Sequence, residues 1–378
     1  MDLSQKISSA AVGVKINEWY NMIRQFSVPD AEILKAEVER EIEQMEEDQY
    51  LLVYYSLMCF RHQLMLDSLK PSEKQKKRPT IPDLLEKIES PQRKLTGLLK
   101  YYSLFFRGMY EFNQKGYVEA IHYYRKAEKE LSVVTDEMEK AEFHYKLADA
   151  YYQINQYYVS LNHLTIAKRL FESNSFYKVK TIGCNMMFGA NMYDMNRLTE
   201  AESYYREALS LAEQLNEKNI KRIIGVIYHN LGLVSEREQQ LNKAESLFRK
   251  ALDMKEHADT IYGIRSQYML SRVLYQTDKS EEARSFYYIA LHRALKCHEE
   301  EYKSKLKIIY SIYEEYDHKD VEQSLHYLEK KRLWSEYAEL TEILGDYHFE
   351  KGNFAEGRKF LKRAITAQTK KFKVTEAL

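Results

Sequence analysis

Glycine and proline are scarce in this sequence: its 378 residues include 12 glycines and five prolines. Tight turns between strands rely on these residues, because glycine adopts positive φ without strain and proline fixes φ. The scarcity therefore argues against sheet-based folds and favours long helices with short connections. Apolar residues make up 44% of the chain and aromatic residues 13%, which is too much for a disordered protein. The composition predicts an all-α fold.

Clustered cysteines, an excess of one charge and long apolar runs are also missing. Cys59, Cys184 and Cys297 stand alone, which leaves no disulfide framework and no zinc spacing. Lys plus Arg and Asp plus Glu number 57 each, so no overall field attracts nucleic acid or an anionic membrane. No apolar run approaches the ~18 residues of a membrane span, and residues 1–13 lack the apolar stretch of a signal peptide. We therefore expect a cytoplasmic protein with no direct nucleic-acid or membrane partner.

Proline marks one boundary along the chain. Four of the five prolines lie between residues 71 and 91, beside a basic run at 74–78. Such a run can bind nucleic acid or an acidic protein, but it has no interleaved aromatic residues, so we interpret 71–94 as a solvated linker. Before the linker, apolar residues recur at helical spacing. This pattern predicts a three-helix bundle over residues 1–70.

After the linker, residues 95–378 repeat a pattern of small and large residues. A small residue is followed 12 positions later by another, after 16 positions by an aromatic or large residue, and after 19 positions by alanine. Clear copies begin at Gly108, Ala148, Gly189, Gly232, Ser271 and Gly345, and a weak copy begins at Ile312. The spacing is typical of tetratricopeptide repeats, in which small residues lie where two helices touch. We predict about seven repeats, stacked around a groove that binds a peptide or a helix.

Common catalytic motifs are absent from the sequence, and its histidines are not clustered, so we interpret them as structural or surface residues. One local feature is an acidic stretch from Glu37 to Asp48 that ends at Gln49. An acidic helix face is usually just solvated. The alternative is that Gln49 presents its amide to a partner protein, where it could hold an attacking water by donating and accepting one hydrogen bond each.

Several strings resemble one family, the Rap proteins of bacilli. They are KINEWY at 15–20, MEEDQ at 45–49, YYSLM at 54–58, FRH at 60–62, LTGLL at 95–99, FFRGMYE at 105–111 and EKAEF at 139–143. The resemblance implies a three-helix bundle, a linker and seven repeats, and a protein that acts on bacterial response regulators. Some members hydrolyse the aspartyl-phosphate of the sporulation phosphorelay regulator, and others sequester a DNA-binding regulator, such as the competence activator, without catalysis. A short, imported signalling peptide inhibits both kinds.

The resemblance also implies roles for individual residues. Gln49 corresponds to the catalytic glutamine, and the chain itself binds no cofactor because the regulator supplies Mg²⁺ and the aspartate. The contacts to the regulator fall on Glu47, Asp48, Leu52, Phe60, Leu98, Asp136 and Glu139. The peptide-binding residues fall on Tyr152, Asn191, Asp194 and Asn230. For Phe60 and Leu98 the alternative is simple core packing.

Three functions are open on this basis. The first is dephosphorylation of a response regulator, the second is non-catalytic sequestration of a DNA-binding regulator, and the third is a scaffold for an unrelated helix. Gln49 does not separate the first two, since non-catalytic members can carry the same glutamine. The proline-bearing linker further predicts that the bundle swings away from the repeats and that the peptide closes it.

Overall fold

The computed structural model describes residues 6–69, 95–215 and 220–373, as helices joined by short turns. Within that part of the chain the β pairing is limited to one isolated parallel bridge between Ile7 and Met45. The all-α prediction is confirmed. No helix among the described residues is long and apolar enough to cross a membrane. The chain divides into two compact units, residues 1–153 and 154–378. The predicted linker at 71–94 lies outside the described residues.

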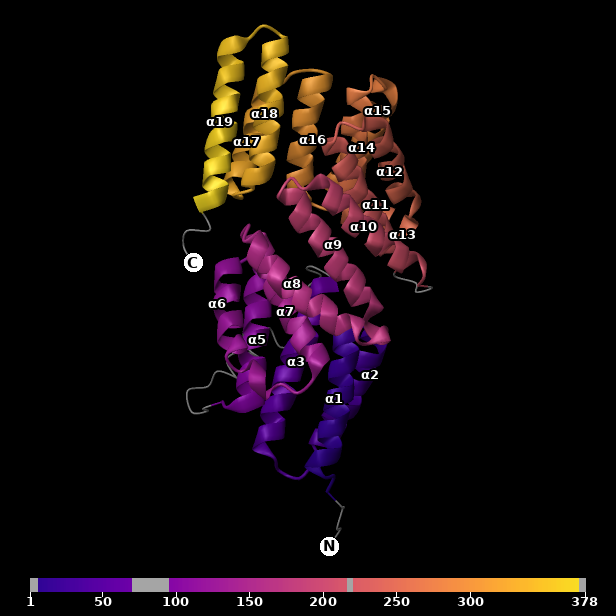
Figure 1. The fold of residues 1–378 in the computed structure, drawn as a ribbon, viewed down its shortest axis with the longest axis vertical. Helices are drawn as coiled ribbons and strands as arrows, with labels where there is room; N and C mark the ends of the chain where they lie inside the picture. Colours follow the sequence, from indigo (N-terminus) through magenta and orange to yellow (C-terminus); the bar gives the residue numbers. More distant parts are fainter. Residues whose placement is uncertain (1–5, 70–94, 216–219, 374–378) are drawn as a thin grey trace. The chain divides into compact units, whose positions relative to one another are not determined.

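The first unit holds the three N-terminal helices and the first three helices that follow the linker (Figure 1). Ser8 caps the first helix by accepting a hydrogen bond from the Ala11 N–H, and Pro29 lies in the first turn of the second. The elements are α1 (Ser9–Gln25), α2 (Val28–Ile42), α3 (Gln49–Leu69), α5 (Gly97–Asn113), α6 (Tyr117–Glu128), the 3-10 turn η1 (Leu131–Val133) and α7 (Glu137–Gln153).

An aromatic core joins the N-terminal helices to α5. The Tyr20 ring of α1 meets the Tyr102 ring edge-on, with centroids 5.6 Å apart, and the rings of Phe60 and Phe106 lie 6.5 Å apart. Rings of this size bury much apolar surface, so the bundle and the first repeat helices form one packed body. The predicted boundary between bundle and repeats therefore falls inside the first compact unit, and the division into 1–70 and 95–378 stays a prediction.

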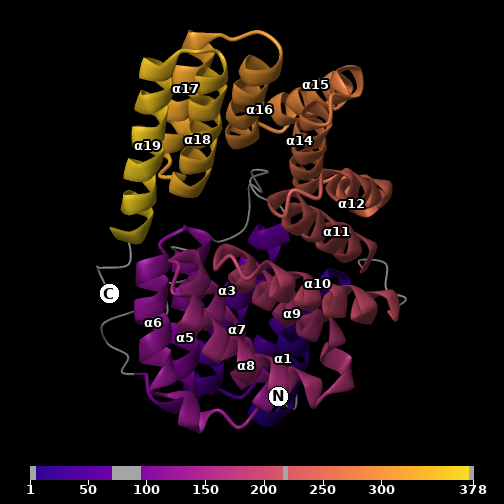
Figure 2. The same ribbon diagram turned by 45° about the horizontal axis from the view of Figure 1, so that its top comes forward.

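The second unit is a series of helix pairs, whose members lie side by side in both views (Figures 1 and 2). Its elements are α8 (Tyr157–Glu172), η2 (Ser175–Tyr177), α9 (Lys178–Asp194), α10 (Leu198–Glu213), α11 (Ile220–Arg237), α12 (Leu241–Asp253), α13 (Lys255–Ala258), α14 (Ile261–Gln276), α15 (Ser280–Lys296), α16 (Glu300–Tyr313), α17 (His318–Lys330), α18 (Trp334–Glu350) and α19 (Phe354–Lys373). Leaving aside α8 and the short α13, the described helices of this unit make five successive pairs, from α9 with α10 to α18 with α19, at the spacing that the repeat pattern predicted.

The small residues of the repeat pattern lie where paired helices touch. A Cβ atom on Gly189 would come within 2.6 Å of the Tyr205 ring, 16 residues later, and one on Gly232 within 2.5 Å of the Phe248 ring. In a third copy the Ser271 hydroxyl donates to the Ala283 carbonyl, 12 residues later, at 2.9 Å. The spacings of 12 and 16 residues are therefore contacts between the two helices of a pair.

The turns between helices use few glycines, because other residues adopt the left-handed conformation there. Gln239 between α11 and α12 has φ of 60°, and Asp278 between α14 and α15 has φ of 58°. At the first turn the next N–H, that of Gln240, donates back to the Ser235 carbonyl at 2.8 Å, which closes the helix end. This explains how a chain with 12 glycines makes so many tight turns.

Candidate functional site

Gln49 is the first residue of α3, and its side chain is exposed. Asp48 defines the start of the helix, because its Oδ1 accepts from the Leu51 N–H at 3.1 Å. The Gln49 amide donates from Nε2 to Oε1 of the exposed Glu47 at 3.1 Å. Its second N–H and its Oε1 have no partner among the described residues. An amide held by one N–H in this way can still donate one hydrogen bond to a water molecule and accept another.

The apolar residues predicted to contact the regulator differ in exposure. Leu52, one turn after Gln49, and Leu98 at the start of α5 are half-buried. Phe60 is 1% exposed and packs between the rings of Phe106 and Tyr110, each 6.5 Å away. In this arrangement Phe60 is a core residue of the first unit and is closed to a partner.

Two of the four predicted acidic contacts, Asp136 and Glu139, lie at the start of α7. Asp136 is partly exposed, and its Oδ1 caps α7 by accepting from the Met138 N–H at 2.8 Å. Its Oδ2 accepts from Arg24 Nη1 of α1 at 2.7 Å. Glu139 is fully buried, with an exposed fraction of 0%. Asp136 is therefore open to a partner, and Glu139 is not.

Three donors surround the buried Glu139 carboxylate. Its Oε2 accepts from the Tyr20 hydroxyl at 2.7 Å and from Arg24 Nη1 at 3.3 Å, and its Oε1 accepts from the Tyr101 hydroxyl at 3.0 Å. Burial raises the pKa of Glu139, although the Arg24 charge and the tyrosine hydrogen bonds oppose the rise. Burial also acts to raise the pKa of Asp136, but Arg24 and two backbone N–H groups lower it overall. Arg24 thus donates hydrogen bonds to two acids, of which Asp136 is partly exposed and Glu139 is buried.

The predicted contacts do not form one patch. Leu51 lies beside Gly13 near the start of α1, whereas Arg24, near its end, binds Asp136. The 11 residues between Gly13 and Arg24 span about 16 Å of helix. Glu47, Asp48, Gln49 and Leu52 thus gather at one end of α1, and Asp136 lies near the other.

The sequence reasoning missed Tyr20, Arg24 and Tyr101 as partners of Glu139. The sequence contains part of the evidence for this contact. Arg24 follows Tyr20 by four residues, which places a cation on the buried face of α1, where it needs an acidic partner.

A groove of about 830 Å³ runs across the second unit. The first helix of each pair from α9 to α18 contributes to its lining. Two predicted peptide-binding residues, Asp194 on α9 and Asn230 on α11, line it and are half-buried. Asn191 is fully buried; its Nδ2 donates to the Met187 carbonyl at 2.8 Å, and it does not line the groove. Tyr152, half-buried at the end of α7, belongs to the first unit.

Charged side chains are numerous in the groove. Arg272 is 4% exposed and donates to Glu236 and Glu339, each at 2.5 Å. Burial works to lower the pKa of Arg272, but the two acids and Tyr268 raise it well above its usual range. Acidic residues outnumber Arg and Lys in the lining. The acids are Asp194, Glu236, Glu336, Glu339, Glu342 and Asp346, and the cations are Arg237, Arg265, Arg272 and Lys305. The groove therefore favours a ligand that carries a positive charge.

Two histidines of the groove share one serine. The buried Ser266 hydroxyl lies 2.9 Å from His257 Nε2 and 2.9 Å from His229 Nδ1. Burial lowers the pKa of His229 to about 3 and that of His257 to about 4, so both are neutral near pH 7. Ser266 has no exposed surface, which keeps it from acting as a nucleophile toward a ligand. The cluster adds uncharged polar groups to the groove.

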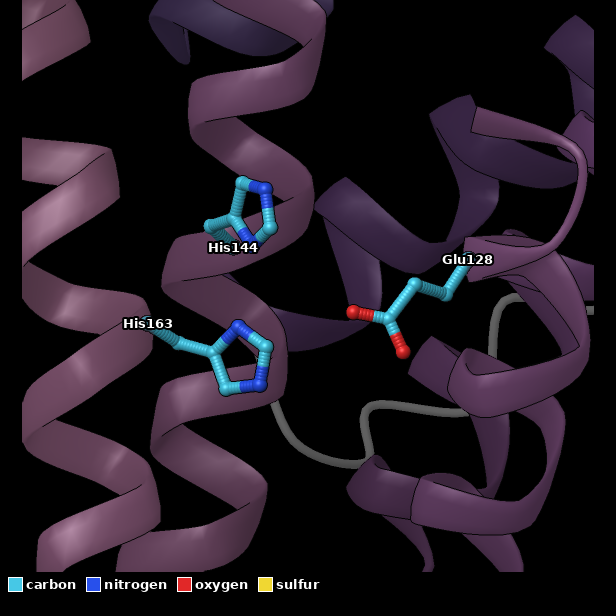
Figure 3. Close-up of side chains that lie close together, drawn as sticks. All are labelled: Glu128, His144 and His163. Carbon is cyan, nitrogen blue, oxygen red and sulfur yellow. The ribbon is translucent and has the colours of Figure 1, made fainter. Parts of the chain in front are cut away.

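One pair of possible metal ligands lies within the first unit. Figure 3 shows Glu128, at the end of α6, and His144 on α7, whose donor atoms lie within 4.8 Å of each other. His163, also drawn there, is on α8 and belongs to the second unit. Two protein ligands are fewer than the three or four that hold zinc. Within the described part of the first unit, this pair alone does not make a metal centre.

Comparison with known proteins identifies relatives along the whole chain. Residues 6–67 match the family described as response regulator aspartate phosphatase H, N terminal, and 186–219 and 226–257 each match a tetratricopeptide repeat family. Response regulator aspartate phosphatase H of Bacillus subtilis (strain 168) is 44% identical over 368 residues, which is 97% of both chains. Response regulator aspartate phosphatase A of the same strain is 39% identical over 371 residues, again 97% of both.

A solved structure has the same fold. It is a Rap protein complexed with competence and sporulation factor, with a TM-score of 0.84 and 32% sequence identity, and the match covers 97% of this chain and 99% of that one.

Proposed function

Because the chain belongs to the Rap family of response regulator aspartate phosphatases, we propose that it binds a phosphorylated response regulator of the sporulation phosphorelay type and hydrolyses its aspartyl-phosphate. A short imported signalling peptide inhibits it from the repeat groove. The observation that carries the function is relatedness over 97% of the chain, including the segment around Gln49, to named aspartate phosphatases.

The exposed amide of Gln49 supplies the chemistry of this chain. A water molecule that is hydrogen-bonded to Gln49 attacks the phosphorus in line; the new O–P bond forms as the P–O bond to the aspartate breaks. The aspartate leaves as a carboxylate, and the proton of the water goes to the phosphate product. Glu47 holds the amide by the 3.1 Å hydrogen bond and so limits its rotation. We place no cofactor on this chain, and the Mg²⁺ that neutralises the phosphoryl group belongs to the regulator.

The regulator contacts include groups that the structure buries. Phe60 is 1% exposed and Glu139 is 0% exposed, because the bundle packs against α5 and α7. A regulator that uses both residues has to meet the first unit after the bundle has moved. We therefore assign the packed arrangement to the inhibited protein, and the peptide favours it.

The peptide occupies the groove of the second unit. Asp194 offers a carboxylate to a basic group of the peptide, and Asn230 can pair with its backbone through one N–H and one carbonyl oxygen. The excess of acids over cations in the lining supports a peptide with positive charge. We place the protein in the cytoplasm, where an imported peptide and a phosphorylated regulator would meet it. The thiols of Cys59, Cys184 and Cys297 form no disulfide, as a reducing compartment requires.

The test is the release of radiolabelled phosphate from a purified, phosphorylated phosphorelay regulator. The wild-type protein should release it, and Gln49→Ala should slow release by about 10²- to 10³-fold, as the loss of one positioning amide does in other enzymes. Gln44→Ala is the matched control, because Gln44 is an exposed glutamine two residues after the end of α2 that we place outside the site. Full activity of Gln49→Ala would remove Gln49 from the mechanism. Binding without release by either protein would favour the sequestration alternative, and a mobility-shift assay with a DNA-binding regulator would test that directly.

A further inference from the structure

Arg265 on α14 is a cation that lies against aromatic rings in the groove. Its guanidinium carbon lies 5.2 Å from the centroid of the Tyr262 ring and 5.6 Å from that of Tyr302. The side chain is half-buried and lines the cavity. Aromatic rings on a planar guanidinium restrict its rotation and leave its N–H groups free to donate in the plane.

Arg265 differs from the other cations of the groove because its contacts are with aromatic rings and not with an acid or a carbonyl group. Arg272 is bound by two acids, and Lys305 Nζ lies 2.8 Å from Glu301 and 3.6 Å from Glu336. Arg237 donates to the Tyr193 carbonyl at 2.9 Å. Among the described residues, none forms an ion pair or a hydrogen bond with Arg265, and the charges of Glu301 and Glu299 act on it without such a contact. A partly desolvated guanidinium with free donors binds a carboxylate through two parallel hydrogen bonds.

Asp194 and Arg265 lie on different helices of the groove, near opposite ends of those helices. Asp194 is five residues after the small residue Gly189 of its repeat, whereas Arg265 is six residues before Ser271, the equivalent residue of its own repeat. Because the first helices of successive repeats run in the same direction, these registers are at opposite helix ends. Asn230, on the helix between α9 and α14, lies in between. From α9 to α14 the groove thus presents an acid, Asp194, then an amide that can pair with a peptide backbone, Asn230, and then a cation, Arg265.

We propose that Arg265 binds the α-carboxylate at the C-terminus of the inhibitory peptide, an inference that rests on the proposed function of the groove. A linear peptide always ends in this carboxylate, whatever its side chains, so a fixed cation can recognise it in every sequence. The basic part of the peptide then lies toward Asp194. The subsite also sets the direction in which the chain runs, from α9 toward α14.

The experiment compares peptide termini and Arg265 variants in one binding assay. A synthetic library of six-residue peptides with free C-termini is selected on the full-length protein, and the tightest binder is resynthesised with a C-terminal amide. Affinities of both peptides are measured by fluorescence anisotropy for wild type, Arg265→Gln and Arg265→Lys. Arg358→Gln is the control, because Arg358 is an exposed arginine of α19 outside the groove. Thermal unfolding of each variant shows whether it is folded.

We expect amidation and Arg265→Gln each to weaken binding roughly 10- to 100-fold, as for a charged hydrogen-bonded pair, and together to weaken it little more than either alone. Arg265→Lys should restore part of the affinity, and Arg358→Gln should change nothing. Equal binding of the acid and the amide would overturn the subsite, even if Arg265→Gln weakened both, because the cation would then meet a side chain. Normal binding by a folded Arg265→Gln would also overturn it. If no peptide bound wild type, the peptide-binding function itself would fail, and the subsite with it.

Discussion

Arg24→Gln tests whether the buried acid of the first unit depends on a single cation. Glutamine keeps the polarity and loses the charge, so Glu139 would retain its two tyrosine donors and lose its only cationic donor among the described residues. Removing one partner of a buried ion pair costs about 3–5 kcal/mol. The second acidic partner of Arg24, Asp136, is 46% exposed, so the ion pair between Arg24 and Asp136 contributes less than about 1 kcal/mol. We expect the unfolding free energy of the first unit to fall by about 3 kcal/mol.

The loss should depend on pH in a direction that follows from Glu139. A carboxyl whose pKa is higher in the folded chain stabilises the fold below its unfolded pKa, near 4.5, and this contribution disappears as pH rises through the folded pKa. Without Arg24 the pKa of Glu139 rises further, so the destabilisation should be smaller at pH 5 than at pH 7.5. Asp136 does not change the stability between pH 5 and pH 7.5. Its pKa is lowered from 3.8, and the stability it adds is lost only at lower pH.

Urea unfolding followed by the fluorescence of Trp19 measures this effect. Trp19 is fully buried in the first unit and donates to His62 Nδ1 at 2.8 Å, and Trp334→Phe removes the other tryptophan of the chain. With a slope of about 2 kcal/mol per molar urea, the midpoint of Arg24→Gln should fall by roughly 1.5 M. Arg40→Gln, on the exposed side of α2, is the control. Equal midpoints for the two variants, or a loss as large at pH 5 as at pH 7.5, would refute the argument.

Three further predictions concern the second unit. Gly232→Ala should destabilise it by about 1–3 kcal/mol, because a Cβ there would lie 2.5 Å from the Phe248 ring, and an unchanged melting temperature would contradict this. Gln239→Gly should stabilise it by up to about 1 kcal/mol, since Gln239 has φ of 60°; a lower melting temperature would count against that reasoning. His229→Asn should flatten the pH dependence of urea unfolding between pH 7 and pH 5. Burial lowers the pKa of His229 to about 3, so this residue alone makes the wild type lose up to about 1.4 kcal/mol per pH unit as pH falls below 6.5, and identical slopes would disprove the assignment.

Some features of the fold could be predicted because they connect residues close in sequence. Gly189 and Tyr205 are 16 residues apart and touch across one helix pair, so the contact repeats at a readable spacing. The turns were harder to predict in detail. The left-handed positions at Lys115 and Gln239 carry side chains that do not favour positive φ, so residue type gave no signal there.

Some residues of the candidate sites could likewise be predicted from the sequence, and others could not. Gln49 was found from the string around it, which resembles the Rap family, and the structure places it at an exposed helix start. Asn230 and Asp194 were named for the same reason and line the groove. Arg265 had no such signal. Arg265 is distinguished by forming no ion pair or hydrogen bond with the described residues, and that depends on which side chains surround it in space.

By itself, the sequence determined that the protein is all-α, that its repeats stack through small residues, and which family it resembles. Those properties depend on composition, periodicity and strings of neighbouring residues. The tertiary structure decided which charges meet. Glu139 binds Tyr20, 119 residues away along the chain, and Tyr101, 38 residues away, and neither separation follows the repeat spacing. The burial that raises the pKa of Glu139 comes from helices of the bundle and the first repeat together, so it exists only once they have packed.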